Sequence, residues 1–282
     1  MPIYEQTYRR YEARGPLRVV RFWPITREAL RLVLAKRAFL GLLLIGWVPM
    51  LVRVVQIYIV TRFPEAGRIL PIDGKLFGEF LNQQMGLSLL LTIFGGAGLI
   101  ANDLRTGAIL VYLSRPLTRR DYVVGKLSVL LLLNLSVTLA PGLLLYVIGL
   151  GLAPEQYLKL DLWWLAPAIL AQSLVMSLSL SLLSLAVSSL SRSARVAGLG
   201  FFGLFAGLEM ARGVLRSVFD AKWATLLSLQ ADIRVIGGAL FGLTMRRWEQ
   251  VPAQDAALVL LALGAACLLL LRSRVRAVEI VR

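Results

Sequence analysis

The stretch NDLRTGAILVYLSRPLTRRDYVVGKL, residues 102–127, lies between two long apolar segments and carries several signals for the local backbone. Proline disfavours helical geometry at the residue before it. A helix that includes Ala108 to Leu113 should therefore end at residues 114–116. Thr118 and Asp121 have the spacing of a capping box, which predicts a new helix that begins at Arg119. We therefore expect a short helix, a hinge and a second helix between two membrane spans.

The apolar segments on both sides are long enough to cross a bilayer, which takes about 20 helical residues. Hydrophobic residues make up 58% of the 282-residue chain, and its mean hydropathy is +0.74. This composition predicts an all-α integral membrane protein with a six-helix transmembrane domain over residues 38–271. A basic tail and an interfacial helix are expected in 1–37, and a second basic tail in 272–282. The six expected spans are 38–60, 84–101, 127–151, 165–190, 196–215 and 254–271.

The distribution of charge predicts the orientation of these spans. Cytoplasmic loops of membrane proteins accumulate Lys and Arg. The two tails and the loops 102–126 and 191–195 together carry 20 basic and six acidic residues, whereas the other loops carry ten of each. We therefore expect both termini on the cytoplasmic side of a bacterial or archaeal cell membrane. The formal net charge of +15 is then explained by this accumulation of Lys and Arg in cytoplasmic segments of a protein in the lipid bilayer, without nucleic acid as a partner.

Two segments next to the spans are expected to be helical without crossing the membrane. Residues 25–39 have Arg27 and Arg31 on one face, which is typical of a helix that lies along the inner interface. Residues 223–245 are apolar apart from Asp232 and Arg234, and a full span would bury both charges at high cost. We expect a short helix or a re-entrant hairpin there, on the outer side, that ends near residues 237–238.

Small and polar side chains recur inside the spans. Six serines on the fourth span fall within about 80° of arc on one helical face. They could form a helix-packing seam or line a permeation route between two copies of the protein. Gly203 and Gly207 form a small-xxx-small packing motif in the fifth span. The serines are Ser173, Ser177, Ser181, Ser184, Ser188 and Ser191.

Charged and polar residues interrupt two other spans. Glu209, Arg212 and Arg216 share one face at the end of the fifth span, where an ion cluster at the outer interface or an outer gate is expected. The third span is expected to be locally polar and kinked, at Asn134, Ser136, Thr138 and Pro141.

The composition excludes several kinds of chemistry. The chain has no histidine, so imidazole zinc sites, histidine-ligated haem and Ser-His-Asp catalysis are excluded. Its one cysteine, Cys267, leaves no internal disulfide. Neither Gly74-Lys75 nor Gly125-Lys126 has the remaining residues of a phosphate-binding loop. We therefore expect no catalytic, cofactor or metal site on this chain, which disfavours a membrane enzyme.

The stretch 102–127 resembles the cytoplasmic loop of type-2 ABC transporter permeases, the ABC-2 transmembrane subunits. In that family an acidic residue ends the second span, a short helix with glycine follows, and Ser/Arg-Pro, a basic residue, Tyr and Gly-Lys lead into the third span. Asp103 stands where glutamate is more usual. The matching residues are Asp103, Gly107, Ser114, Arg115, Pro116, Arg119, Tyr122, Gly125 and Lys126.

The resemblance implies that this loop is a coupling element for a separate ATP-binding subunit, which would hold the ATP and Mg²⁺. It also implies an exporter, built with a second copy of the chain or with a related permease. The scarcity of charge inside the spans suggests a lipophilic or amphipathic cargo. The expected coupling residues are Asp103, Arg105, Thr106, Gly107, Leu110, Leu113, Ser114, Arg115, Pro116, Arg119, Arg120, Tyr122 and Lys126.

An ion-coupled secondary transporter is the alternative function. Such a carrier should have carboxylates deep in its spans, or matched broken helices in repeated halves. The only candidate carboxylate by sequence is Glu209, which lies near the end of its span.

Overall fold

The computed structural model describes residues 22–63, 65, 72–113, 117–152, 162–243 and 251–275. Every regular element in these ranges is a helix, and six helical stretches are long and apolar enough to cross a membrane. This result confirms the predicted all-α membrane fold with six spans. The stretches are Arg37–Arg62, Gly74–Thr106, Arg119–Leu152, Leu162–Ser188, Ala194–Phe219 and Ala253–Arg274.

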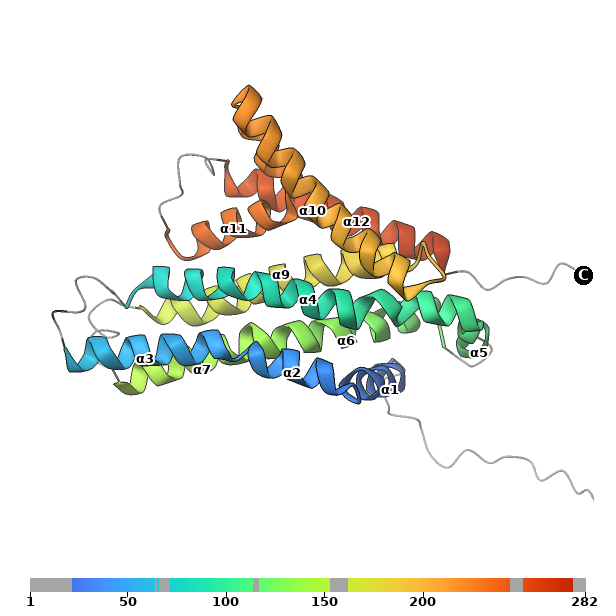
Figure 1. The fold of residues 1–282 in the computed structure, drawn as a ribbon, viewed down its shortest axis with the longest axis horizontal. Helices are drawn as coiled ribbons and strands as arrows, with labels where there is room; N and C mark the ends of the chain where they lie inside the picture. The colour runs from blue at the N-terminus through green and yellow to red at the C-terminus, as the bar shows by residue number, and fades with distance from the viewer. Residues whose placement is uncertain are drawn as a thin grey trace, which may run out of the picture.

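The chain enters the bundle through α1 (Trp23–Leu34), which is seen nearly end-on in Figure 1 and so lies across the long helices. Ile25, Ala29 and Val33 form its buried face, while Arg27 and Arg31 are exposed. The amphipathic helix expected at 25–39 ends earlier, because the backbone at Lys36 is extended. The residues after Lys36 belong to the first span instead.

The first and third spans are each broken in the middle. The first consists of α2 (Arg37–Ile45) and α3 (Val48–Arg62), and the third of α6 (Arg119–Val137) and α7 (Leu139–Leu152). A Cβ added to Gly46 would lie 2.7 Å from Cγ1 of Val137, so the two breaks are in contact. Thr138 donates from Oγ1 to the carbonyl of Asn134 at 2.9 Å, and proline follows three residues later. The predicted kink in the third span is therefore present.

The second span, α4 (Gly74–Thr106), is much longer than the predicted 84–101. Asp73 caps its start by accepting a hydrogen bond from the amide of Lys75 at 2.9 Å. Polar residues in the first turns are held by other helices: Glu79 pairs with Arg53 at 3.5 Å, and Gln84 donates to the carbonyl of Gly46 at 2.8 Å. These tertiary contacts extend the helix beyond its apolar part.

The centre of the bundle is formed by α4 and α9 (Leu165–Ser188), with α6 packed beside them (Figure 1). A short 3-10 helix, η2 (Leu162–Trp164), leads into α9. The hydroxyl of Ser188 donates to the carbonyl of Ala97 at 2.8 Å, so a side chain of α9 directly contacts the backbone of α4. Such close approach requires small side chains between the two helices.

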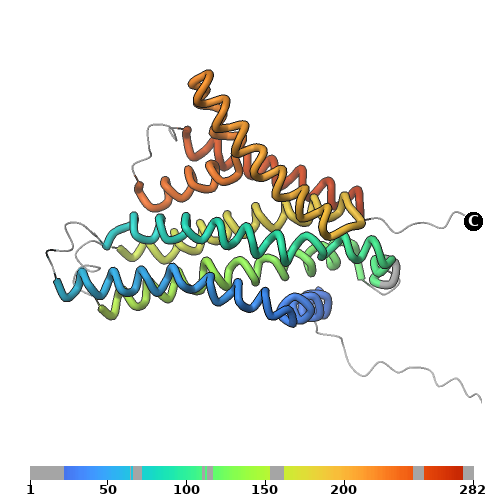
Figure 2. The backbone as a smooth tube through the Cα atoms, in the orientation of Figure 1, coloured from blue at the N-terminus to red at the C-terminus, as the bar shows by residue number. Residues whose placement is uncertain are grey.

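The last part of the chain forms a second layer on α4 and α9. It consists of α10 (Ala194–Phe219), η3 (Lys222–Leu227), α11 (Leu229–Leu240) and α12 (Ala253–Arg274). Figure 2 shows the end of α10 diverging from the bundle. The chain reverses at Asp220, which has φ of 46°, and returns along α10. The predicted short helix in 223–245 is thus confirmed, although α11 continues past residues 237–238.

Candidate functional site

The expected coupling element is a helical hairpin made from the end of α4, α5 (Ala108–Leu113) and the start of α6. Gly107 ends α4 with φ of 70°, a left-handed conformation that favours glycine. Thr118 and Asp121 form the predicted capping box, since Thr118 Oγ1 accepts from the Asp121 amide at 3.2 Å and Asp121 Oδ2 accepts from the Thr118 amide at 2.9 Å. The predicted short helix and the start of α6 at Arg119 are therefore confirmed.

A buried polar cluster joins the two long arms of this hairpin. The Nζ of Lys126 lies 2.7 Å from Oδ2 of Asp103, and the hydroxyl of Tyr122 donates to the same oxygen at 2.7 Å. Only 4% of Lys126 is exposed, and its ammonium group also lies 5.8 Å from the ring centre of Tyr112 on α5. Because a buried charge is stable only when it is paired and hydrogen-bonded, these four residues are held as one unit.

Two residues near this cluster were not expected from the sequence. Tyr112 packs against the Tyr122 ring at 5.7 Å between centroids. Thr26 on α1 donates to the carbonyl of Gly125 at 3.0 Å. A Cβ on Gly125 would lie 3.1 Å from Cβ of Ile25, so this glycine lets α1 approach α6 closely. No sequence signal relates residue 26 to residue 125, because the contact depends on how the helices pack.

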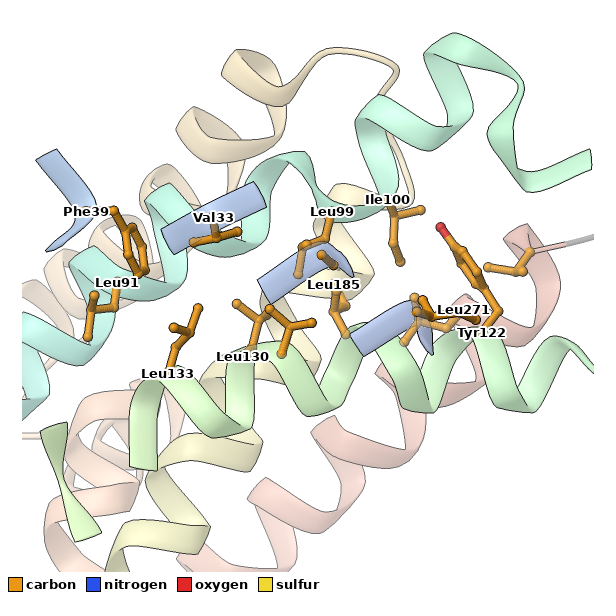
Figure 3. Close-up of a cluster of buried hydrophobic side chains, with 14 of the residues drawn as sticks. Val33, Phe39, Leu91, Leu99, Ile100, Tyr122, Leu130, Leu133, Leu185 and Leu271 are labelled. Atoms are coloured by element: carbon orange, nitrogen blue, oxygen red, sulfur yellow. The ribbon is translucent and has the colours of Figure 1, made fainter. Parts of the chain in front are cut away.

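An apolar cluster supports the hairpin from the bundle side (Figure 3). Tyr122 is completely buried and belongs to the same cluster as Leu185 on α9 and Leu271 near the end of α12. Val33 of α1 and Ile100 of α4 belong to it too. The base of the hairpin is therefore packed against α1, α9 and α12 as well as against the body of α4.

The opposite side of the hairpin is exposed and basic. Arg105 and Thr106 at the end of α4 and Arg119 and Arg120 at the start of α6 are all exposed. Other expected coupling residues, namely residues 114–116 and the side chains of Leu110 and Leu113, lie outside the described part of the chain. The described hairpin thus has a buried ion pair behind exposed cations.

The serine stripe lies inside the chain. Ser173, Ser177, Ser181, Ser184 and Ser188 are at most 1% exposed, along the seam between α4 and α9. This position puts them between helices of one chain rather than on a surface that a second copy could reach. Ser191 was wrongly expected in the stripe. It follows the end of α9, where its hydroxyl accepts from the amide of Ser193 at 3.0 Å.

The expected ion cluster connects α10 to the segment that follows it. Arg212 donates to Oε1 of Glu209, and the Ser228 hydroxyl donates to Oε2 of the same carboxylate. Arg216 was expected in this cluster but instead donates to Oγ1 of Thr225 at 3.0 Å. Side chains added at Gly203 and Gly207 would meet no atom within 4 Å among the described residues, so a packing role for this motif would require another molecule.

The sequence did not predict the burial of Asp232 on α11. Only 1% of this residue is exposed, and its Oδ1 has no hydrogen-bond partner in the described part of the chain. Burial raises the pKa of its carboxyl group to about 7. Asp232 is therefore fully buried, whereas the side chain of Glu209 is 31% exposed. Within the described ranges, no three Asp, Glu, Cys or His residues are grouped in a way that could hold a metal ion.

The chain was compared with known families and with curated proteins. The family model described as ABC-2 family transporter protein matches residues 85–271, well over half of the chain. The match covers the hairpin and extends from α4 almost to the end of α12. The comparison with curated proteins gave no match. The chain therefore belongs to the ABC-2 family of transporter proteins and is a membrane-spanning permease of the ABC transporter type.

Proposed function

We propose that this chain is the permease subunit of an ABC exporter and that its α4–α5–α6 hairpin receives the force of a separate ATP-binding subunit. The observation that carries the proposal is the buried contact of Asp103 with Lys126 and Tyr122, directly behind an exposed basic surface. ATP and Mg²⁺ would be bound by the partner, since the chain has no phosphate-binding loop.

The hairpin has the construction that transmission of force requires. A partner that displaces α5 would move α4 and α6 together, because the ion pair between Asp103 and Lys126 connects them. The hydrogen bond from Thr26 to Gly125 would pass the same displacement to α1. Rigid elements that move as one body can convert a small shift at one surface into rearrangement of a bundle.

The exposed side of the hairpin is suited to an acidic partner surface. Arg105, Arg119 and Arg120 can each form charge-assisted hydrogen bonds with carboxylates. The excess of basic residues in the tails and in this loop supports a cytoplasmic position for the hairpin. An ATP-binding subunit would therefore meet it in the compartment where ATP is present.

The direction of transport and the kind of cargo are inferred from less specific features. The outward direction is supported by the resemblance of residues 102–127 to permeases of exporters. The apolar spans, which contain few charged residues, support a lipophilic or amphipathic cargo. A complete transporter would contain a second copy of this chain or a related permease.

The proposal can be tested by charge reversal on the hairpin. Arg119→Glu/Arg120→Glu should abolish co-purification with the ATP-binding partner subunit, because the two carboxylates that replace the exposed cations would repel an acidic surface. Arg272→Glu/Arg274→Glu is a matched control, since it reverses two exposed arginines at the end of α12 and should leave the complex intact. Undiminished binding of the ATPase by the hairpin variant would refute the coupling role.

A further inference from the structure

The two central helices, α4 and α9, run in the same direction with a constant offset in sequence. Hydrogen bonds join Ser184 to the carbonyl of Thr92, 92 positions apart, and Ser188 to the carbonyl of Ala97, 91 positions apart. Extended along both helices, an offset near 90 puts Ser173 level with Gln84 and Ser177 level with Ser88. We refer to the polar residues at these matching levels of α4 and α9 as the column.

The two halves of this column differ. In the half toward the coupling hairpin the hydroxyls have protein partners, and Ser188 also accepts from the amide of Ala101 at 3.1 Å. In the half toward Gly74 and Leu165, five polar atoms have no hydrogen-bond partner among the described residues, although all five side chains are 0% exposed. These atoms are Oε1 of Gln84 and the hydroxyl oxygens of Ser88, Ser173, Ser177 and Ser181.

Such a concentration of unpartnered polar atoms is unusual in a folded interior. More than about nine-tenths of buried polar groups have a partner, which can be an ordered water molecule. Five exceptions in one column therefore point to a ligand that hydrogen-bonds to them. Gln84 already uses its amide nitrogen for the carbonyl of Gly46, at 2.8 Å, so its Oε1 can only accept.

The chemistry of the five atoms identifies this ligand. It must donate to Oε1 of Gln84 and must be able to donate to, or accept from, a series of hydroxyl groups. Water does both, and it commonly makes about three hydrogen bonds to otherwise unsatisfied buried groups. A metal cation does not fit, because none of the five side chains carries the negative charge that a buried cation requires.

We propose that a file of ordered water molecules occupies the half of the α4–α9 seam between Gln84 and Ser181 and ends where Ser184 bonds directly to α4. The seam is thus hydrated in one half and closed by direct protein contacts in the other. This inference does not depend on the identity of the cargo or on the ATP-binding subunit.

Two methionines of the chain can report on water in the seam. Met85 and Met176 directly adjoin Gln84 and Ser177 in sequence and are 5% and 1% exposed. Met50 on α3 is a matched control, because it is 3% exposed and belongs to a different apolar cluster. Hydroxyl radicals formed by X-ray radiolysis of bound water convert methionine to its sulfoxide, which mass spectrometry detects with the oxygen label of H₂¹⁸O.

The proposal predicts that Met85 and Met176 are oxidised several-fold faster than Met50 in the full-length protein in detergent. The triple variant Ser173→Ala/Ser177→Ala/Ser181→Ala removes three of the anchoring hydroxyls, so oxidation of Met176 should fall to the rate of Met50. Oxidation of Met85 and Met176 at the rate of Met50 in the wild-type protein would overturn the proposal. So would an unchanged rate in a folded triple variant. If the variant does not fold, the wild-type comparison alone decides.

Discussion

The carboxyl group of Asp232 should make the stability of this protein depend on pH. It lies on α11, outside the six spans, with 1% of the residue exposed. Burial raises its pKa from the ordinary value of 3.8 to about 7, because the charged form loses its hydration. The substitution Asp232→Asn keeps the size of the side chain but removes the ionisation.

The sign and the size of the effect follow from this difference in pKa. Between pH 4 and pH 7 the unfolded chain has released the proton, while the folded protein still binds it. Stability is therefore highest at low pH and falls by about 1.4 kcal/mol for each pH unit as the pH rises. From pH 5 to pH 7 the loss is about 2 kcal/mol. The loss of stability levels off above pH 7, where Asp232 is ionised in both the folded and the unfolded protein.

Thermal unfolding in detergent, followed by tryptophan fluorescence at pH 5 and pH 7.5, measures this effect. A loss of about 2 kcal/mol should lower the Tm of the wild-type protein by about 5 °C over this range. Asp232→Asn should remove that part of the pH dependence. The control Asp255→Asn alters an exposed carboxylate in the first turn of α12 and should retain it. If the Tm of the Asp232→Asn variant fell as much between the two pH values as that of the wild type, the assignment of this pH dependence to Asp232 would be wrong.

Three further substitutions test the hairpin and the central seam. Lys126→Met should cost about 3–5 kcal/mol in the free energy of unfolding, because Asp103 would remain buried without its cation, and adding Asp103→Asn should restore part of the loss. Thr118→Ala should cost about 1 kcal/mol by removing the cap of α6, seen as a lower Tm. Ser188→Ala should cost about 1–3 kcal/mol, since it strips partners from the α4 backbone, whereas Ser181→Ala should cost less. Equal Tm values for the two serine variants would contradict this reading of the seam.

Much of the fold could be predicted from the sequence because its signals are local. The six spans follow from the length of their apolar stretches, which depends only on neighbouring residues. The start of α6 follows from a capping box within four residues, and the end of α4 lies at Gly107. For the same reason, residues 102–127 alone carry the resemblance of the hairpin to ABC-2 permeases.

The first and last residues of the spans were less predictable from the sequence. The second span begins at Gly74 rather than residue 84, because contacts with Arg53 and Gly46 hold its polar first turns in place. The sequence also placed Arg216 in a cluster with Glu209, whereas the reversal at Asp220 brings it to Thr225. Spacing along one helix shows which residues share a face, but it does not show what lies opposite that face.

The sequence alone determined that this protein is a six-span helical membrane protein with a basic hairpin between its second and third spans. Hydropathy and capping depend on residues within a single helix, so they do not require contacts between helices. Only the tertiary structure decided that Lys126 is buried against Asp103, that the serine stripe faces α4, and that Asp232 is enclosed. Each of these facts depends on residues far apart in the chain, whose contacts form only when the helices pack together.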